Sequence, residues 1–275
     1  PPALAHRQQA PGALVLQVGR LDLKRESPFG VDLVDVSLRV HAGEVVGIAG
    51  VSGNGQRELL YALSGEDRRA PAASISIANQ PAGRLPPSRR RALGLHFVPE
   101  ERLGRGAVPE MSLADNLLLT RREAVGTLGW LRTGRLRDQA AGIMERFRVK
   151  AAGPQAPARS LSGGNLQKFI MGREIDAKPT LLIVSQPTWG VDVGAAAQIR
   201  AEILALRDAG CAVLVVSEEL DELFELSDRL HVMAKGRMSP SVARRDATVE
   251  QIGEWMSGLW HADVQQQLQQ IEASH

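Results

Sequence analysis

The sequence predicts an α/β protein with a mainly parallel central sheet, and three features support this prediction. Short runs rich in β-branched residues alternate with segments of helical periodicity. A glycine-rich turn joins one apolar run, 45–49, to an amphipathic segment. A stretch of helical character, 101–160, interrupts the alternation between Gly- and Pro-rich joints. A chain of 275 residues, with 44% hydrophobic and 23% charged residues, is long enough to bury such a core.

The individual elements are expected where the periodicity changes. The expected strands are Leu14 to Val18, Leu33 to Val40, Val45 to Ala49, Gly94 to Val98, Leu181 to Val184, Ala212 to Val216 and Leu230 to Ala234. Candidate helices in the helical stretch are Leu113 to Leu119 and Leu136 to Phe147. Beyond Ser241 we expect two polar helices, anchored by Trp255 and Trp260, and a frayed Gln-rich end. The resulting divisions are a Pro-rich linker (1–12), a core (13–100 and 161–240), a helical lobe (101–160) and a helical tail (241–275).

Composition limits the possible functions. The formal net charge of +2 is too small to indicate a nucleic-acid partner, and Arg89, Arg90 and Arg91 are predicted to form a solvated helix face. The apolar runs are far shorter than the roughly 20 residues of a membrane span, so other subunits would have to cross any membrane at which the protein works. The single cysteine, Cys211, lies in an apolar strand pattern and is expected to be a buried hydrophobe.

The segment "IAGVSGNGQRELLYALSG" has the layout of a phosphate-binding P-loop, in which a strand, a glycine-rich turn and a helix follow one another. Compared with the pattern G-x-x-x-x-G-K-[ST], Gln56 replaces the lysine and Arg57 replaces the hydroxyl residue. The glycines can still let the backbone curl around phosphates as a nest of N–H donors. Losing a charge-assisted contact costs roughly 1.5–3 kcal/mol, which weakens binding about ten- to a hundredfold. The candidate phosphate-binding residues are Gly50, Ser52, Gly53, Asn54, Gly55, Gln56 and Arg57.

A second loop, the LSGGN loop, opens a predicted helix and consists of Leu161, Ser162, Gly163, Gly164 and Asn165. Its backbone N–H groups, the Ser162 hydroxyl and the positive end of the helix would suit a phosphate that approaches from outside. An ordinary serine-capped helix is the alternative interpretation. Two apolar strands then end in polar pairs, Ser185 with Gln186 in "LLIVSQPTWGVDVGA" and Ser217 with Glu218 in "AVLVVSEELDEL".

The order of these motifs resembles the nucleotide-binding domain of an ABC ATPase, from about Leu14 to Met238. The segments "GVSGNGQREL", "VPEERLGRG", "EMSLADNLLLT", "LSGGNLQK", "QPTWGVDVGA" and "SEELDEL" together resemble the second, C-terminal nucleotide-binding domain of tandem ATPase subunits in bacterial simple-sugar and nucleoside importers. The P-loop and the Gln-Pro-Thr segment are more similar to the nucleoside branch.

The resemblance implies a P-loop NTPase (RecA-like) core with a mainly parallel sheet, an antiparallel β edge and an inserted helical subdomain. The implied partners are a second ABC nucleotide-binding domain, in the same full-length chain, transmembrane permease subunits and, indirectly, a solute-binding protein. No nucleic-acid partner is implied. The implied location is peripheral, on the cytoplasmic side of the cell membrane.

The chain departs from the family at the residues around its P-loop, which we call its own site. In the family, the lysine and hydroxyl residue that Gln56 and Arg57 replace contact the β- and γ-phosphates and Mg²⁺. The Mg²⁺-directing aspartate is matched by Ser185 and the water-polarising glutamate by Gln186. Two further contacts to γ-phosphate are matched by acidic residues, Glu100 and Glu218. We therefore expect weak ATP binding, doubtful Mg²⁺ binding and no catalytic residue in the own site.

The resemblance also implies that this chain contributes to a second site, because ABC sites form between two domains that face each other head to tail. The LSGGN loop, together with Asp192, is expected to complete the ATP site of the partner domain. Phe29 is the only nearby aromatic residue for adenine stacking. Trp189 is either an interface anchor or a core residue, and the sequence leaves both open.

The leading hypothesis is a catalytically degenerate importer domain, which couples to membrane subunits through the helical lobe and a groove near Pro99 to Pro109. A structural ABC module without nucleotide is one alternative. A soluble ABC ATPase of repair or translation would carry long coiled-coil or basic insertions. A P-loop kinase or GTPase would need the missing lysine.

Overall fold

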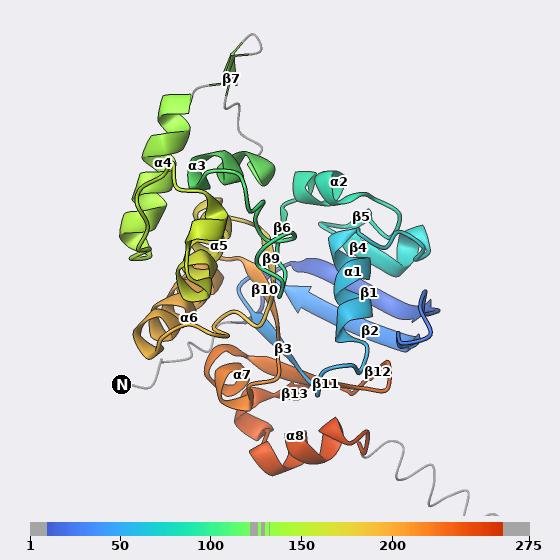
Figure 1. Cartoon of the computed structure of the whole chain (residues 1–275). Helices are drawn as coiled ribbons and strands as arrows, with labels where there is room; N and C mark the ends of the chain where they lie inside the picture. Colours follow the sequence, from blue (N-terminus) through green and yellow to red (C-terminus); the bar gives the residue numbers. More distant parts are fainter. Residues whose placement is uncertain (1–9, 122–125, 128–129, 132, 261–275) are drawn as a thin grey trace, which may run out of the picture.

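The structure is a computed structural model that describes residues 10–121, 126–127, 130–131 and 133–260. Figure 1 shows a central sheet with helices α5 and α6 on one side and helix α1 with a second sheet on the other. The predicted Pro-rich linker and Gln-rich end lie largely outside the described residues. The fold class is the one that the sequence predicts.

Seven strands of the described residues form the central sheet, in the order β12-β11-β3-β10-β9-β6, with β13 paired to β11. Neighbouring strands from β11 to β6 run parallel, whereas β12 and β13 are antiparallel to β11. Both faces of the parallel strands are buried, which explains their continuous apolar sequences. The bounds are β3 Val45–Ala49, β6 Leu95–Val98, β9 Leu181–Ser185, β10 Ala212–Ser217, β11 Arg229–Ala234, β12 Arg237–Met238 and β13 Val242–Ala243.

A four-stranded antiparallel sheet covers one face of the central sheet, with helix α1 (Gln56–Ser64) in the core that they share. Leu59 and Leu63 of α1 are fully buried in this core with Ile48 of β3 and Leu16 of β1. The strand order is β2 (Leu33–His41), β1 (Leu14–Leu23), β4 (Ile75–Ile77) and β5 (Gln80–Pro81). Strand β1 extends beyond the predicted Val18, with register shifts between Val18 and Leu23.

The opposite face of the central sheet packs against helices, including those of the helical lobe. The lobe elements are α3 (Leu113–Asn116), the 3₁₀ turn η2 (Leu117–Leu119), strands β7 (Gly126–Thr127) and β8 (Trp130–Leu131), and α4 (Thr133–Arg146). Helix α5 (Gly163–Asp176) packs closely on α4. A Cβ atom at Gly172 would lie 2.7 Å from both Ile143 Cγ2 and Phe147 Cδ2, so this close approach requires glycine.

The remaining elements are α2 (Pro87–Ala92), α6 (Val193–Asp208), α7 (Leu220–Leu226) and α8 (Val249–Met256), with 3₁₀ turns η1 (Ala72–Ser74), η3 (Ala158–Ser160) and η4 (Arg244–Asp246). Trp255 and Trp260 are buried, as expected, whereas the second expected tail helix lies outside the described residues. Cys211 is also buried, and burial raises the pKa of its thiol to about 12. No helix in the described ranges combines the length and apolar character of a membrane span.

The predicted solvated face at Arg89, Arg90 and Arg91 is wrong for Arg90, which is fully buried. Its guanidinium donates to four backbone carbonyls, those of Ala62, Leu63, Gly83 and Leu85. Two of these carbonyls belong to the last turn of α1, where the helix leaves acceptors unpaired. A guanidinium with five donors can satisfy such a group of acceptors, so Arg90 lies in the interior while Arg89 is exposed.

Candidate functional site

A cavity of about 690 Å³ lies at the carboxyl edge of the parallel sheet. The P-loop follows β3, Glu218 follows β10, Gln186 follows β9 and the segment with Glu100 lies beyond β6. These strands are immediate neighbours, so the residues after them converge on one edge. The cavity lining includes most of the predicted own site: Gly50, Ser52, Gly53, Gln56, Arg57, Glu100, Ser185, Gln186 and Glu218. The two remaining P-loop residues, Asn54 and Gly55, are not among the lining residues.

The P-loop glycines are required by geometry. Gly53 and Gly55 adopt positive φ angles of 84° and 104°, a region that other residues rarely occupy. A Cβ atom at Gly55 would also lie 3.1 Å from Gly236 Cα, whereas one at Gly53 would meet nothing within 4 Å. At Gly50, a Cβ atom would lie 2.5 Å from Gln56 Nε2. The loop therefore keeps the tight curl that a phosphate cradle needs.

Gln56 folds back into this loop and fastens it. Its Oε1 accepts a hydrogen bond from the Asn54 N–H at 2.9 Å, and its Nε2 donates to the Val51 carbonyl at 2.9 Å. Asn54 also links the P-loop to the β11–β12 turn by hydrogen bonds, because its Oδ1 accepts from the Lys235 N–H and its carbonyl accepts from the Gly236 N–H. The neutral amide thus holds the loop in shape and adds no charge to it.

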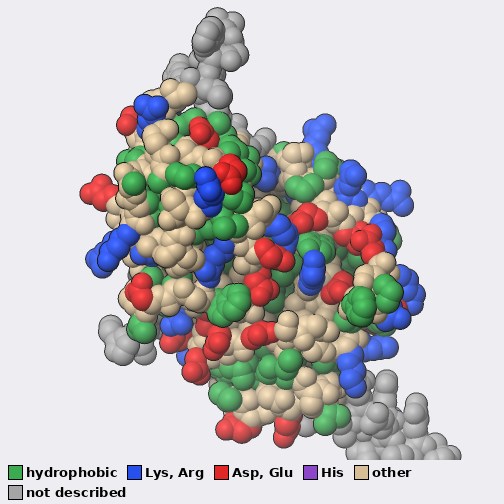
Figure 2. All heavy atoms as spheres, in the orientation of Figure 1, with side chains coloured by type: hydrophobic (Ala, Val, Ile, Leu, Met, Phe, Trp, Pro, Cys, Tyr) green, Lys and Arg blue, Asp and Glu red, His purple; other side chains and the backbone are tan. Residues whose placement is uncertain are grey.

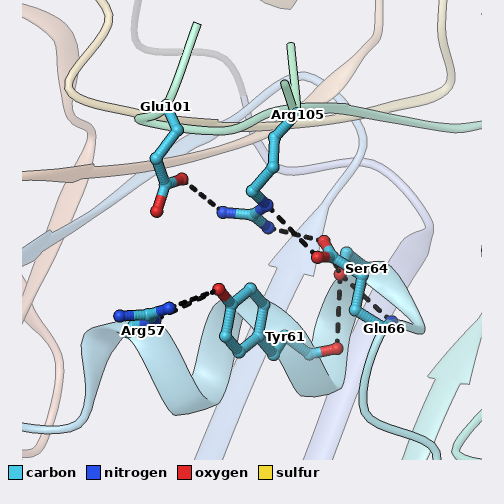
Figure 3. A network of polar contacts seen from close by, with 6 residues as sticks. All are labelled: Arg57, Tyr61, Ser64, Glu66, Glu101 and Arg105. Carbon is cyan, nitrogen blue, oxygen red and sulfur yellow. Dashed lines mark hydrogen bonds and ion pairs between the residues drawn. The ribbon is translucent and has the colours of Figure 1, made fainter. Parts of the chain in front are cut away.

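Arg57 and Arg105 both contact Tyr61, and Figure 3 shows the three side chains with their partners. The Arg57 guanidinium donates two hydrogen bonds, of 3.1 and 2.9 Å, to Tyr61 Oη. Arg105 lies over the ring, 4.6 Å from its centroid, and forms ion pairs with Glu66 and Glu101. Sequence reasoning did not single out Tyr61 and Arg105, because their contact joins α1 to a segment about 40 positions away and depends on tertiary packing.

A hydrogen-bonded network of Gln186, Ser217 and Glu222 joins the ends of β9 and β10. Gln186 has a left-handed backbone, with φ of 51°, and its Oε1 accepts from the Glu218 N–H at 3.3 Å. Ser217 Oγ lies 3.2 Å from the same oxygen and 2.9 Å from Glu222 Oε2. Ser185 is buried. An amide and a hydroxyl cannot take a proton from attacking water, so these positions offer no general base.

Glu100 lines the cavity together with two other carboxylates, those of Glu101 and Glu218, whose charges act on it. Burial raises the pKa of Glu100, and the negative charges of Glu101 and Glu218 raise it further, while Arg57 opposes them. Glu101 itself is paired with Arg105. The edge of the cavity beside the P-loop thus combines an arginine with acidic groups, and acidic and basic side chains are interspersed over the face shown in Figure 2.

The LSGGN loop lies outside the cavity, at the start of the 14-residue helix α5. Ser162 caps this helix by accepting from the Asn165 N–H at 3.3 Å, as the alternative interpretation expected, and it also accepts from Asn165 Nδ2 at 3.0 Å. Ser162 and Gly163 lie at the surface, with Leu161, Gly164 and Asn165 half-buried. The helix start is therefore open to a ligand from outside.

Arg102 and Gln167, which sequence reasoning did not single out, connect the LSGGN loop to the loop after β9. Arg102 donates to Gln167 Oε1 at 3.1 Å and to the Trp189 carbonyl, and Gln167 Nε2 donates to the Pro187 carbonyl at 2.9 Å. Asp192 caps α6, since its carboxylate accepts from the Ala195 N–H at 2.9 Å, and this bond is the main cause of its lowered pKa.

Two aromatic side chains line the same cavity and are exposed. Phe29 is 97% exposed and Trp189 is 60% exposed. The core-packing alternative for Trp189 is therefore excluded. Phe29 lines the cavity beside Ser27 and Gly30, which places a flat apolar ring within reach of a ligand that occupies the cavity.

The parallel sheet with a P-loop after β3, the antiparallel sheet over α1 and the helical insertion define an ATP-binding cassette, a class of P-loop NTPase. The chain belongs to the ABC transporter family, whose model matches residues 33–189.

The chain is similar to several import ATP-binding proteins. It is 39% identical over 255 residues to the guanosine import ATP-binding protein NupO of Bacillus subtilis, covering 92% of this chain and 49% of that protein. It is 40% identical over 250 residues to the nucleoside import ATP-binding protein NupA of Lactococcus lactis, covering 90% and 49%. A ribose import ATP-binding protein of Halalkalibacterium halodurans is 34% identical over 239 residues, with 87% and 48% covered. The chain spans about half the length of these curated relatives.

Solved structures agree on the fold. A nucleotide-free ATP-binding cassette from an ABC transporter has a TM-score of 0.68 at 22% identity, covering 84% of this chain and 91% of that one. An ATP-binding subunit of an ABC transporter has a TM-score of 0.70 at 20% identity, covering 88% and 99%.

Proposed function

We propose that the chain is the nucleotide-binding domain of an ABC importer for nucleosides or simple sugars, with a degenerate own site and with a LSGGN loop that completes the ATP site of a second domain. The observation that carries the proposal is the contrast between the two loops. The cavity around the P-loop holds Gln56, Ser185 and Gln186 where the family has charged groups, whereas Ser162 and Gly163 keep the helix start open.

The relatives support the importer assignment, since their names specify import of guanosine, nucleosides and ribose. The family membership argues against a P-loop kinase or GTPase, and these relatives favour an importer over a repair or translation ATPase. The match to about half of each relative supports a place in a tandem subunit, in the second, C-terminal half that the motifs resemble. The proposal includes permease subunits and a solute-binding protein as partners, and a position on the cytoplasmic face of the membrane. It also includes the division into linker, core, helical lobe and helical tail, and the coupling groove near residues 99–109.

In this proposal the own site contributes binding without catalysis. The P-loop fits a phosphate group, because its backbone is curled and its glycines leave the cradle open. A phosphate must compete with Gln56 for the Asn54 N–H, which weakens the binding of ATP. The purified chain is expected to bind ATP and to release no phosphate above background. Turnover of about 1 s⁻¹ or faster in a phosphate-release assay would contradict this part.

The donated loop is tested in the assembled transporter with an intact partner domain. Ser162→Asp keeps a helix-capping side chain but adds a negative charge where the phosphate would approach. Ser162→Asn keeps the cap without the charge and is the matched control. We expect ATPase activity and transport to collapse in Ser162→Asp and to persist in Ser162→Asn.

Gln56→Ala gives the corresponding change in the own site. It removes two neutral hydrogen bonds within the P-loop, each worth about 1 kcal/mol, so transport should fall only mildly. Melting temperatures of the variants exclude a general folding defect. Transport that stops in Gln56→Ala and continues in Ser162→Asp would refute the asymmetric assignment.

A further inference from the structure

The own site has a cationic side chain beside its phosphate cradle, Arg57, that forms no ion pair within the described ranges. Arg57 is the second residue of α1, and its guanidinium bonds to the neutral hydroxyl of Tyr61. Among the residues that the structure describes, no carboxylate forms an ion pair with it. Arg69 and Arg105, the other arginines of the cavity, are each paired with two acidic residues. Arg57 therefore has charge available for an anionic ligand.

The contacts around Tyr61 hold Arg57 at the cavity. Arg105 packs on the Tyr61 ring and is fixed by Glu66 and Glu101, as Figure 3 shows. The ring in turn positions Arg57 through its hydroxyl and through a cation–π contact of 5.1 Å. A guanidinium has five donors, so Arg57 can bind phosphate oxygens in a bidentate manner while one bond to Tyr61 remains.

The start of α1 and the end of β9 offer poor ligands for Mg²⁺, which prefers carboxylate, hydroxyl and phosphate oxygens, whereas the cavity carboxylates Glu100 and Glu218 lie after β6 and β10. The first residues of α1 supply an amide and a guanidinium. At the end of β9, Gln186 Oε1 already accepts the Glu218 N–H, and Ser185 is buried. No group of three or more acidic, His or Cys side chains in the described ranges is arranged to hold a metal ion. A fixed guanidinium also repels a divalent cation.

We propose that the cavity binds a nucleotide polyphosphate in its metal-free form, with the Arg57 guanidinium in place of Mg²⁺. The inference rests on the proposed nucleotide-binding function of the own site. Glu100 and Glu218 would repel the added negative charge of a metal-free phosphate chain, and Arg57 is the residue that offsets them. Because the site then needs no divalent ion, its occupancy is independent of the Mg²⁺ that ATP hydrolysis elsewhere requires.

Calorimetric titration of the purified chain with ATP, once with EDTA and once with saturating Mg²⁺, tests the inference. The wild-type chain is expected to bind at least as tightly in EDTA. Arg57→Ser should weaken binding in EDTA about tenfold or more, because a charge-assisted contact is lost. Arg89→Ser, which removes an equal charge from an exposed position of α2, is the matched control and should leave binding unchanged. Arg57→Lys should retain most of the affinity.

A triple variant, Gln56→Lys/Arg57→Ser/Ser185→Asp, gives a second measurement, because it returns metal-binding chemistry to the site. Its ATP binding should become tighter with Mg²⁺ than with EDTA. Wild-type binding that requires Mg²⁺, or equal affinities of the wild type and Arg57→Ser in EDTA, would overturn the inference and leave the proposed nucleotide site standing. Absence of ATP binding in both buffers would overturn the nucleotide site itself.

Discussion

Replacement of the buried Arg90 by methionine is expected to destabilise the whole chain. The side chain is 0% exposed and donates to four backbone carbonyls, two of them at the end of α1. Burial lowers its pKa to about 10, so the guanidinium is still protonated at neutral pH. Methionine fills most of the volume but supplies no donor, which leaves these acceptors without a partner in the interior.

The expected loss follows from the four acceptors. An unsatisfied buried acceptor costs about 1 kcal/mol or more, giving roughly 4 kcal/mol in all. Burial of the methionine side chain returns about 1 kcal/mol, so the free energy of unfolding should fall by about 3 kcal/mol. For a chain of this size, each kcal/mol lowers Tm by about 2–4 °C, which predicts a decrease of about 6–12 °C.

Scanning calorimetry of Arg90→Met beside Arg89→Met measures this difference. Arg89 is exposed on the same helix, so its replacement should change the free energy of unfolding by less than about 0.5 kcal/mol. Equal Tm values for the two variants would refute the role assigned to Arg90.

Three further predictions concern stability and the own site. Glu174 is buried, and burial raises its pKa, but the Arg173 charge and the His96 bond lower the pKa to about 2. The contribution of Glu174 to the free energy of unfolding is therefore present above about pH 4.5 and is lost as the pH falls toward 2. Glu174→Gln should therefore cost about 3–5 kcal/mol in urea denaturation at pH 7 and should flatten the acid limb of the stability curve. Gly55→Ala should lower the free energy of unfolding by about 1–3 kcal/mol and weaken ATP binding, whereas Gly53→Ala, which has open space around it, should lower the free energy of unfolding by about 1 kcal/mol. Thermal melts measure the stability and titrations measure the ATP binding. Glu100→Gln should tighten ATP binding at neutral pH. As the pH falls, the wild-type affinity should approach that of the variant, because the raised pKa of Glu100 lets the carboxylate lose its charge. Equal affinities of the two proteins at neutral pH would contradict this prediction.

The strands of the parallel sheet could be predicted because both of their faces are buried. Continuous apolar runs mark β3, β9 and β10, and the structure adds one polar residue to the ends of the last two, Ser185 and Ser217. Strands β4 and β5 were not predicted, since runs of three and two residues carry no periodicity. The prediction failed at Arg90 because its acceptors lie up to 28 positions away, so no local pattern reveals them.

Some residues of the site could also be predicted from the sequence, and others could not. Residues that follow directly after strands, such as Gln186 and Glu218, could be assigned to the cavity, because the ends of parallel strands meet at one edge. The Tyr61–Arg105 contact could not be predicted, since it depends on how α1 packs against residues beyond β6, whereas Arg57 and Tyr61 lie four positions apart on one helix. The exposure of Trp189 likewise depends on the course of a loop rather than on its sequence.

The attachment of the P-loop to the β11–β12 turn makes distant parts of the chain open together. Asn54 accepts from the amides of Lys235 and Gly236, and the Gly236 carbonyl accepts from the Val34 amide of β2 at 2.9 Å. Separation of the turn from the loop would expose all three amides to solvent at once. In hydrogen–deuterium exchange these amides should therefore show one common opening free energy, as a single cooperative unit assembled from segments about 20 and 180 positions apart.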